Sequence, residues 1–220
     1  MRKLALPLLF VAAPLAAQAE ELVIAALGDS LTAGYGLPQE DGLVPQLQGW
    51  LDAEGAEVRL INAGVSGDTS AGGLSRIGWT LTEEVDALIV ALGGNDYLRG
   101  LPPEALKDNL GGILEAAGEA GVEVLLVGIS ATANYGADYR DAFNAVYPDL
   151  AEQYGALVYP NIFAALQDGR GLDEARRAYM QADGIHPNAE GVGLIVEAIG
   201  PSVLDLAEAA RGDDTEAAVR

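Results

Sequence analysis

Residues 22–31 read LVIAALGDSL, an apolar run of six residues followed by Gly28, Asp29 and Ser30. Unbroken apolar runs of this length are typical of strands that are buried on both faces, as in parallel sheets. The glycine and the two polar residues mark a turn at the carboxyl end of that strand. Because ligands of open α/β sheets bind beyond this end, the stretch predicts a central strand and a candidate functional site directly after it.

Four more apolar runs follow, and amphipathic segments separate them. Alternation of strands and helices implies right-handed βαβ crossovers and a doubly wound α/β sheet. No internal repeat or linker interrupts the alternation, so a single domain is predicted. The further strands are predicted at 58–62, 87–92, 122–127 and 156–159, and the helices at 43–53, 70–82, 103–120, 138–154 and 188–210.

The first nineteen residues have the pattern of a secretory signal peptide. A basic start and an apolar run lead to Ala17-Gln18-Ala19, an A-x-A cleavage site. The alternative is a retained membrane anchor, but the run is short for a bilayer and contains two prolines. We therefore expect an exported protein, periplasmic or secreted, with one domain at 20–211 and an acidic, frayed tail at 212–220.

The composition is strongly acidic, with a formal net charge of −21. Such a surface repels nucleic acid phosphates and anionic membranes, so neither is an expected partner. Solubility, or adaptation to a salty environment, is sufficient to explain the acidity. The sequence has no cysteine and one histidine, which excludes a disulfide framework and zinc sites rich in cysteine or histidine. There is also no P-loop, no G-x-G-x-x-G and no G-x-S-x-G elbow.

Ser30 is the best candidate for a nucleophile, because it stands where the first strand ends and a glycine keeps the turn open. The alternative is that Ser30 only caps the following helix. The single histidine, His186, lies in Asp183-Gly184-Ile185-His186-Pro187. A carboxylate three residues before an imidazole can accept its Nδ1–H and leave Nε2 free to face a serine. A structural or solvated histidine is the alternative, and Asn188 is expected to cap the last helix.

Two further turns are predicted to reach the same edge of the sheet. The turn at 62–70 can present backbone N–H groups, with Gly67 allowing a close approach, and Asn95 can offer a side-chain amide. Acyl transfer needs such donors because negative charge builds on the carbonyl oxygen in its transition state. Each turn can also be purely structural. Asp29, Asp68 and Asp96 fit turn or helix-cap positions, with a metal cluster as the less favoured alternative.

Together, these segments are similar to the four blocks of the SGNH (GDSL-type) hydrolase superfamily. The blocks are a serine in Gly-Asp-Ser, a glycine, an asparagine in Gly-x-Asn-Asp, and Asp-x-x-His. They match in the family's order as Ser30, Gly67, Asn95, and Asp183 with His186. The longer stretches 28–36, 66–70, 92–96, 134–136 and 183–188 resemble the periplasmic branch of arylesterases, acyl-CoA thioesterases and lysophospholipases.

The resemblance implies a flavodoxin-like three-layer α/β/α sandwich with a five-stranded parallel sheet. It also implies hydrolysis of carboxylic esters and thioesters with apolar acyl groups, without a cofactor or metal. Ser30 would attack the carbonyl, His186 would take its proton, and Asp183 would orient the imidazole. The N–H groups of Ser30 and Gly67, with the Asn95 side chain, would form the oxyanion hole. Substrate contacts are expected at Gly94, Asp96, Leu98, Asn134 and Tyr135, with Ile129 to Tyr135 beside the acyl chain.

Two other functions remain open from the sequence. A carbohydrate O-deacetylase of the same superfamily would be expected to have an open cleft rich in aromatic residues, but aromatic residues make up only 6% of the chain. A non-catalytic envelope binding module would have no physical need for the complete set of serine, asparagine, aspartate and histidine. One departure from relatives is Ser130-Ala131-Thr132-Ala133, where a proline-containing turn is expected beside the acyl channel. The expected partner is therefore a small acyl ester or thioester.

Overall fold

The computed structural model describes residues 21–167, 169 and 172–217, so the predicted signal peptide lies outside the described residues. Within them, five parallel strands form one sheet in the order β2-β1-β3-β4-β5, which is the flavodoxin-like order. The predicted sheet is confirmed, and each predicted strand is correct to within two residues at either end. The strands are β1 (Leu22–Gly28), β2 (Val58–Gly64), β3 (Ala87–Ala91), β4 (Glu123–Val127) and β5 (Leu157–Tyr159).

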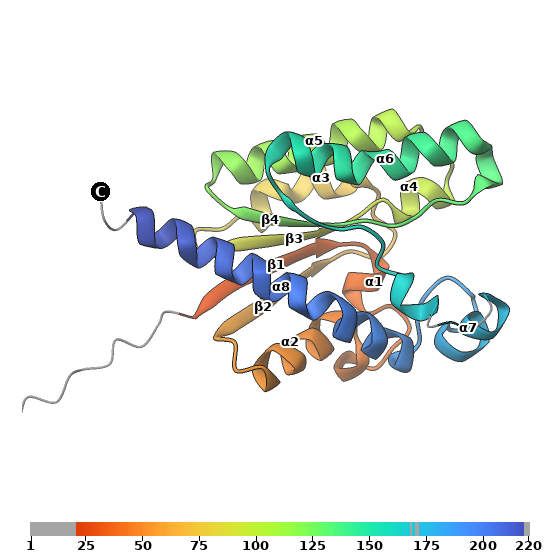
Figure 1. Cartoon of the computed structure of the whole chain (residues 1–220), viewed down its shortest axis with the longest axis horizontal. Coiled ribbons are helices and arrows are strands. Elements are labelled where there is room, and N and C mark those ends of the chain that lie inside the picture. The colour runs from red at the N-terminus through yellow and green to blue at the C-terminus, as the bar shows by residue number, and fades with distance from the viewer. Residues whose placement is uncertain (1–20, 168, 170–171, 218–220) are drawn as a thin grey trace, which may run out of the picture.

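Helices cover both faces of this sheet (Figure 1). One layer contains α2 (Leu43–Ala53) and α8 (Ala189–Ala217), and the other contains α3 (Ser70–Thr80), α5 (Pro103–Glu119) and α6 (Ala137–Tyr154). The short helices α1 (Ser30–Ala33), α4 (Gly94–Leu98) and α7 (Leu172–Tyr179) lie at the carboxyl end of the sheet (Figure 1). Three 3₁₀ turns complete the described elements: η1 (Gln39–Asp41), η2 (Ala133–Tyr135) and η3 (Ala164–Gln167).

Successive side chains of β1 point to opposite faces of the sheet, and each face has its own hydrophobic core. Ile24 and Ala26 pack with α2 and α8, whereas Ala25 and Leu27 pack with α3, α5 and α6. All seven residues of β1 are buried. A strand with helices on both sides has no solvent-facing positions, and this explains why its sequence is continuously apolar rather than alternating.

The predicted ranges of α2, α3, α5 and α6 are correct to within two residues at either end, whereas the predicted end of the last helix is wrong. The last helix does not end at Ala210 but continues to Ala217. Gly212 and the aspartates after it resemble a helix end, yet a glycine inside a helix costs only about 1 kcal/mol and is tolerated here. Helix α7 was not predicted, because it has only eight residues and most of them are polar, although Ala175 and Tyr179 on one of its faces pack into the core.

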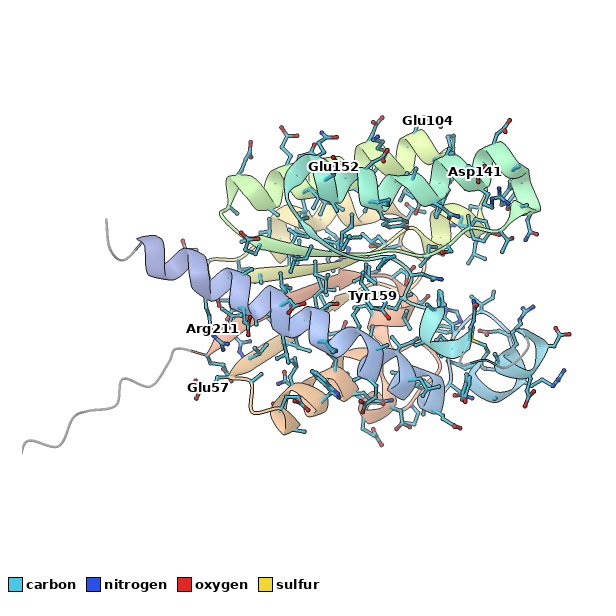
Figure 2. The ribbon with its side chains drawn as sticks, viewed as in Figure 1. Glu57, Glu104, Asp141, Glu152, Tyr159 and Arg211 are labelled. Atoms are coloured by element: carbon cyan, nitrogen blue, oxygen red, sulfur yellow. The ribbon has the colours of Figure 1, made fainter. Side chains whose placement is uncertain are left out.

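Acidic side chains lie on the outer faces of the helices. Glu104 on α5, and Asp141 and Glu152 on α6, are directed to solvent (Figure 2). At the other end of the molecule, the Arg211 guanidinium donates a 2.9 Å hydrogen bond to the backbone oxygen of Glu57.

Among the described residues, no helix is long and apolar enough to cross a membrane.

Candidate active site

The turn after β1 places Ser30 at the first position of α1. The Asp29 carboxylate accepts a 3.1 Å hydrogen bond from the N–H of Leu31, so Asp29 is the N-cap. The alternative that Ser30 caps this helix is therefore wrong. The Ser30 hydroxyl instead lies 2.8 Å from Nε2 of His186. A glycine is required at position 28, because a Cβ there would overlap the Thr32 side chain.

His186 stands on a closed loop between α7 and α8. The N–H of Gln181 donates to the His186 carbonyl oxygen at 2.7 Å, and Met180 pairs with Pro187 in an isolated antiparallel bridge. Asn188 caps α8 as predicted, since its Oδ1 accepts from the N–H of Gly191 at 2.9 Å. These contacts fix the backbone on both sides of the imidazole.

The Asp183 carboxylate has hydrogen bonds to both of its oxygens. Oδ1 accepts from the N–H groups of Ile185 and His186 at 2.9 and 3.1 Å, and Oδ2 lies 2.7 Å from His186 Nδ1. The bond to the imidazole, followed by the two backbone N–H groups, lowers the pKa of Asp183 to about 2. The carboxylate is therefore ionised at neutral pH and holds the proton on Nδ1. Nε2 is then the nitrogen that can accept the Ser30 proton.

An aromatic ring covers one side of this imidazole. The Tyr35 and His186 rings have their centroids 4.7 Å apart and are tilted by 39°. The backbone oxygen of Tyr35 accepts from the Gln181 amide at 2.9 Å, and the same amide donates to the Pro187 oxygen at 2.9 Å. Gln181 therefore ties the turn after α1 to the histidine loop.

The two other predicted oxyanion donors come from the neighbouring turns. Gly67 has φ of +87°, which only glycine adopts readily, and its carbonyl oxygen accepts from the Arg99 guanidinium at 2.7 Å. Asn95 is on the first turn of α4, and its amide nitrogen donates to the Asp29 carboxylate at 3.2 Å. In the part of the chain that the structure describes, the N–H groups of Ser30 and Gly67 have no protein acceptor.

Arg76 holds the ends of β1 and β2 together. Its guanidinium donates to the backbone oxygens of Ala63 and Gly28 at 2.7 and 2.9 Å, and it pairs with the Asp68 carboxylate at 2.7 Å. Both side chains of the ion pair are mostly buried. This residue therefore fixes the two turns that carry Ser30 and Gly67 relative to each other.

Asp96 does not contact the pocket that the sequence assigned to it. The residue is 1% exposed, and its carboxylate accepts from the backbone N–H and the hydroxyl of Ser70 at 2.8 and 2.5 Å. The Asn109 amide donates to the same hydroxyl at 3.0 Å. Asp96 is thus a buried link between α3, α4 and α5, and it is not among the residues that line the pocket.

A pocket of about 300 Å³ opens beside Ser30, Asn95 and His186. Gly94 and Leu98 line it as predicted, whereas Asn134 and Tyr135 are not among its lining residues. Tyr135 instead donates a 3.3 Å hydrogen bond to the Leu98 oxygen and packs against Tyr97. The wall is mostly apolar and is supplied by Leu31, Tyr97, Leu98, Ile129, Phe163, Ile185 and Pro187, with Arg176 as its one cation among the described residues.

The sequence predictions missed Phe163 and Arg176. Phe163 follows the fifth strand, and the rule that ligands bind beyond the carboxyl ends of strands could have placed it near the site. Arg176 comes from α7, whose apolar periodicity extends over only two turns of helix. No local signal in the sequence directs that side chain to the pocket.

Comparison with known proteins shows the family to which this chain belongs. Residues 26–194 match the model of the GDSL-like Lipase/Acylhydrolase family, and this chain belongs to that family. The Pseudomonas aeruginosa protein named "Esterase TesA" is 40% identical over 190 residues, which are 86% of this chain and 91% of that protein. The Escherichia coli protein named "Thioesterase 1/protease 1/lysophospholipase L1" is 36% identical and covers 83% of this chain and 82% of its own length.

A solved structure agrees with these sequence comparisons. The psychrotrophic esterase EstA from a Pseudoalteromonas species, inhibited by monoethylphosphonate, has a TM-score of 0.76 to this chain. The two are 33% identical, and the match covers 84% of this chain and 98% of the other. The order of strands and the layers described above are therefore those of an SGNH hydrolase.

Proposed function

We propose that this protein hydrolyses carboxylic esters and thioesters with apolar acyl groups through an acyl-enzyme on Ser30. The observation that carries the proposal is the continuous hydrogen-bonded series from Ser30 through His186 to Asp183, at the wall of a mostly apolar pocket. A nucleophile, a base and a group that orients the base are the three components that acyl transfer to an enzyme requires.

In the first half of the reaction, Ser30 Oγ attacks the carbonyl carbon and its proton moves to His186 Nε2. The carbonyl oxygen becomes an anion and receives hydrogen bonds from the N–H groups of Ser30 and Gly67 and from the Asn95 amide. The tetrahedral intermediate then collapses, the bond to the leaving group breaks, and the leaving alcohol or thiol takes the proton from Nε2. The acyl group remains as an ester on Ser30.

In the second half, water attacks the acyl-enzyme along the same path. His186 Nε2 takes a proton from the water and later returns one to Ser30 Oγ, which releases the carboxylic acid. Asp183 stays ionised in both halves, because its hydrogen bonds keep its pKa at about 2. Its negative charge stabilises the imidazolium that forms twice in each cycle.

The nature of the pocket wall supports an acyl substrate more than a carbohydrate. Leu31, Ile129 and Phe163 offer apolar surface to an acyl chain, whereas a sugar would require a wall of hydrogen-bonding side chains. Names of relatives that include esterase, thioesterase and lysophospholipase support the same substrate class. The acidic surface argues against nucleic acid as a partner. The sequence of residues 1–19 supports export, with cleavage after Ala19.

A substrate panel tests this proposal. Rates are measured on p-nitrophenyl esters from acetate to palmitate, on acyl-CoA thioesters and on a lysophospholipid, with an acetylated oligosaccharide for comparison. We expect turnover of apolar acyl esters and thioesters, and no turnover in Ser30→Ala. Release of acetate from the oligosaccharide in preference to every acyl ester, or full activity in Ser30→Ala, would contradict the proposal.

A further inference from the structure

Asp29 is the acidic residue of the Gly-Asp-Ser turn, and the reaction steps above do not use it. Its exposed fraction is only 8%, which is unusual for a carboxylate that has no ion-pair partner among the described residues. Burial raises the pKa of Asp29, while the hydrogen bonds from Leu31 and Asn95 act in the opposite direction. A carboxylate kept in such a place requires an explanation beyond solubility.

Each oxygen of this carboxylate has a different partner. Oδ1 accepts from the N–H of Leu31 and so caps the helix that begins with Ser30. Oδ2 accepts from the amide nitrogen of Asn95, 3.2 Å away on α4. Gly94 permits this approach, because a Cβ at that position would stand 3.0 Å from Oδ2. The carboxylate thus joins the nucleophile's turn to the turn that carries the side-chain amide.

The chemistry of the two groups fixes which way the amide faces. An asparagine side chain has a donor end and an acceptor end of nearly equal shape, and only its hydrogen-bond partners decide between them. A carboxylate accepts hydrogen bonds and donates none, so it attracts the NH₂ end of Asn95 and repels the oxygen end. The NH₂ group has two N–H bonds, and Asp29 takes one of them. The second remains for a substrate oxygen in the pocket that Asn95 lines.

We propose that Asp29 is a positioning residue that sets the orientation of the Asn95 amide for the oxyanion. This inference rests on the proposed function, because it gives Asn95 the role of an oxyanion donor. The same role explains why the negative charge of Asp29 lies near the oxyanion, although the two charges repel each other. Correct orientation of the Asn95 donor stabilises the oxyanion by more than this repulsion costs.

Asp29→Asn is the most informative variant. It keeps the shape of the Asp29 side chain but places a donor where Oδ2 accepts the hydrogen bond from Asn95. The new side chain must keep its oxygen toward the N–H of Leu31 to cap α1, and its NH₂ group then faces the NH₂ group of Asn95. Relief of this clash turns the Asn95 amide over and moves its donor away from the substrate oxygen. We expect kcat to fall by about 10²-fold, the effect of losing one oxyanion donor, with KM changed little.

The test is a double-mutant cycle of Asp29→Asn and Asn95→Ala, measured as kcat and KM on a short p-nitrophenyl ester. If Asp29 acts through Asn95, the double variant is no slower than Asn95→Ala alone. Asp86→Asn is the matched control, since Asp86 accepts from the N–H of Val23 at 2.7 Å near the opposite end of β1. This control should leave kcat unchanged. Urea unfolding of each variant checks that the fold persists.

Three results would overturn the inference. Asp29→Asn can lower kcat equally in both backgrounds, which is the result for a residue that acts only on α1 or on folding. Asp29→Asn can instead raise kcat, which is the result if the Asp29 carboxylate affects the oxyanion only by charge repulsion. Alternatively, Asn95→Ala can retain the full rate, in which case there is no donor to orient. The last result leaves the proposed function intact as long as Ser30→Ala is inactive, so the two proposals fail separately.

Discussion

His186 Nε2 lies 2.8 Å from Ser30 Oγ, although the two residues are 156 positions apart in the sequence. The parallel sheet makes this contact possible: Ser30 follows its first strand, and the chain returns through the loop before α8 to the same edge. The proposed chemistry depends on this contact and on the turns that support it.

Ser30→Ala and His186→Ala are each expected to remove most of the turnover, because they remove the nucleophile and its base. The double variant should lose little more than either single variant, since the two side chains act as a unit. Initial rates on a p-nitrophenyl ester measure all three proteins. Losses that multiply in the double variant would mean that the two residues act independently.

Asp183→Asn should lower kcat by about 10⁴-fold, as expected when the orienting group presents an NH₂ in place of an oxygen to the imidazole. The variant can retain an acceptor for the N–H groups of Ile185 and His186, so the loop should keep its structure. Kinetics, with circular dichroism as a control for folding, test this prediction. A rate within tenfold of the native protein would remove Asp183 from the proposed mechanism.

The pH dependence of kcat/KM should follow one ionisation between about pH 5 and 8, the interval in which imidazoles titrate. The rate should rise as the proton leaves Nε2. Asp183 does not contribute in this interval, because its pKa is lowered from 3.8 to about 2. The stability that its bonds provide is fully present above about pH 4 and is lost only as the pH falls toward 2. A rate that stays flat from pH 5 to 8, measured on folded protein, would exclude histidine as the base.

Arg76→Met should destabilise the fold by about 2–4 kcal/mol, because it leaves the mostly buried Asp68 carboxylate and two backbone oxygens without their donor. Arg59→Met is the matched control. Its ion pairs with Glu21 and Glu84 are exposed, so it should cost less than about 1 kcal/mol. Urea unfolding midpoints compare the two. Equal midpoints would mean that Arg76 does not hold the two turns together.

Gly64→Ala should lower both stability and activity, because a Cβ there would overlap the backbone of Ala33 in the helix that begins with Ser30. Gly49→Ala provides the opposite case in the interior of α2, where a Cβ would have nothing within 4 Å. Replacing that glycine should stabilise the protein by about 0.5–1 kcal/mol without affecting kcat. Thermal unfolding and initial rates test both variants, and an active, stable Gly64→Ala protein would show that the turn tolerates displacement.

The sheet and the long helices could be predicted because their apolar patterns follow from burial. β1 is apolar throughout since α2 and α8 cover one of its faces and α3, α5 and α6 the other. The extension of α8 beyond Ala210 could not be predicted, because its residues are mostly polar and have no apolar stripe. α7 was missed for another reason: Ala175 and Tyr179 form an apolar face, but the helix has only eight residues and most of them are polar.

The candidate site was predictable where short motifs carry its residues and less so elsewhere. Ser30, Asp183 and His186 lie together as the motifs suggest, whereas Asp96 is buried with Ser70 rather than open to the pocket. An aspartate in a polar turn has the same sequence pattern whether it is buried or open to a pocket, because only tertiary packing decides its burial. Phe163 reaches the pocket through packing of this kind and has no motif.

The most direct test of Ser30 as the nucleophile is the mass of the protein after reaction with a p-nitrophenyl alkylphosphonate, which transfers its phosphonyl group to an activated serine. We expect one adduct per chain, located by peptide mapping on Ser30, with loss of activity in proportion to labelling. Ser30→Ala should take no label. Inactivation without an adduct on Ser30, or an adduct on another residue that tracks the loss of activity, would contradict this role of Ser30.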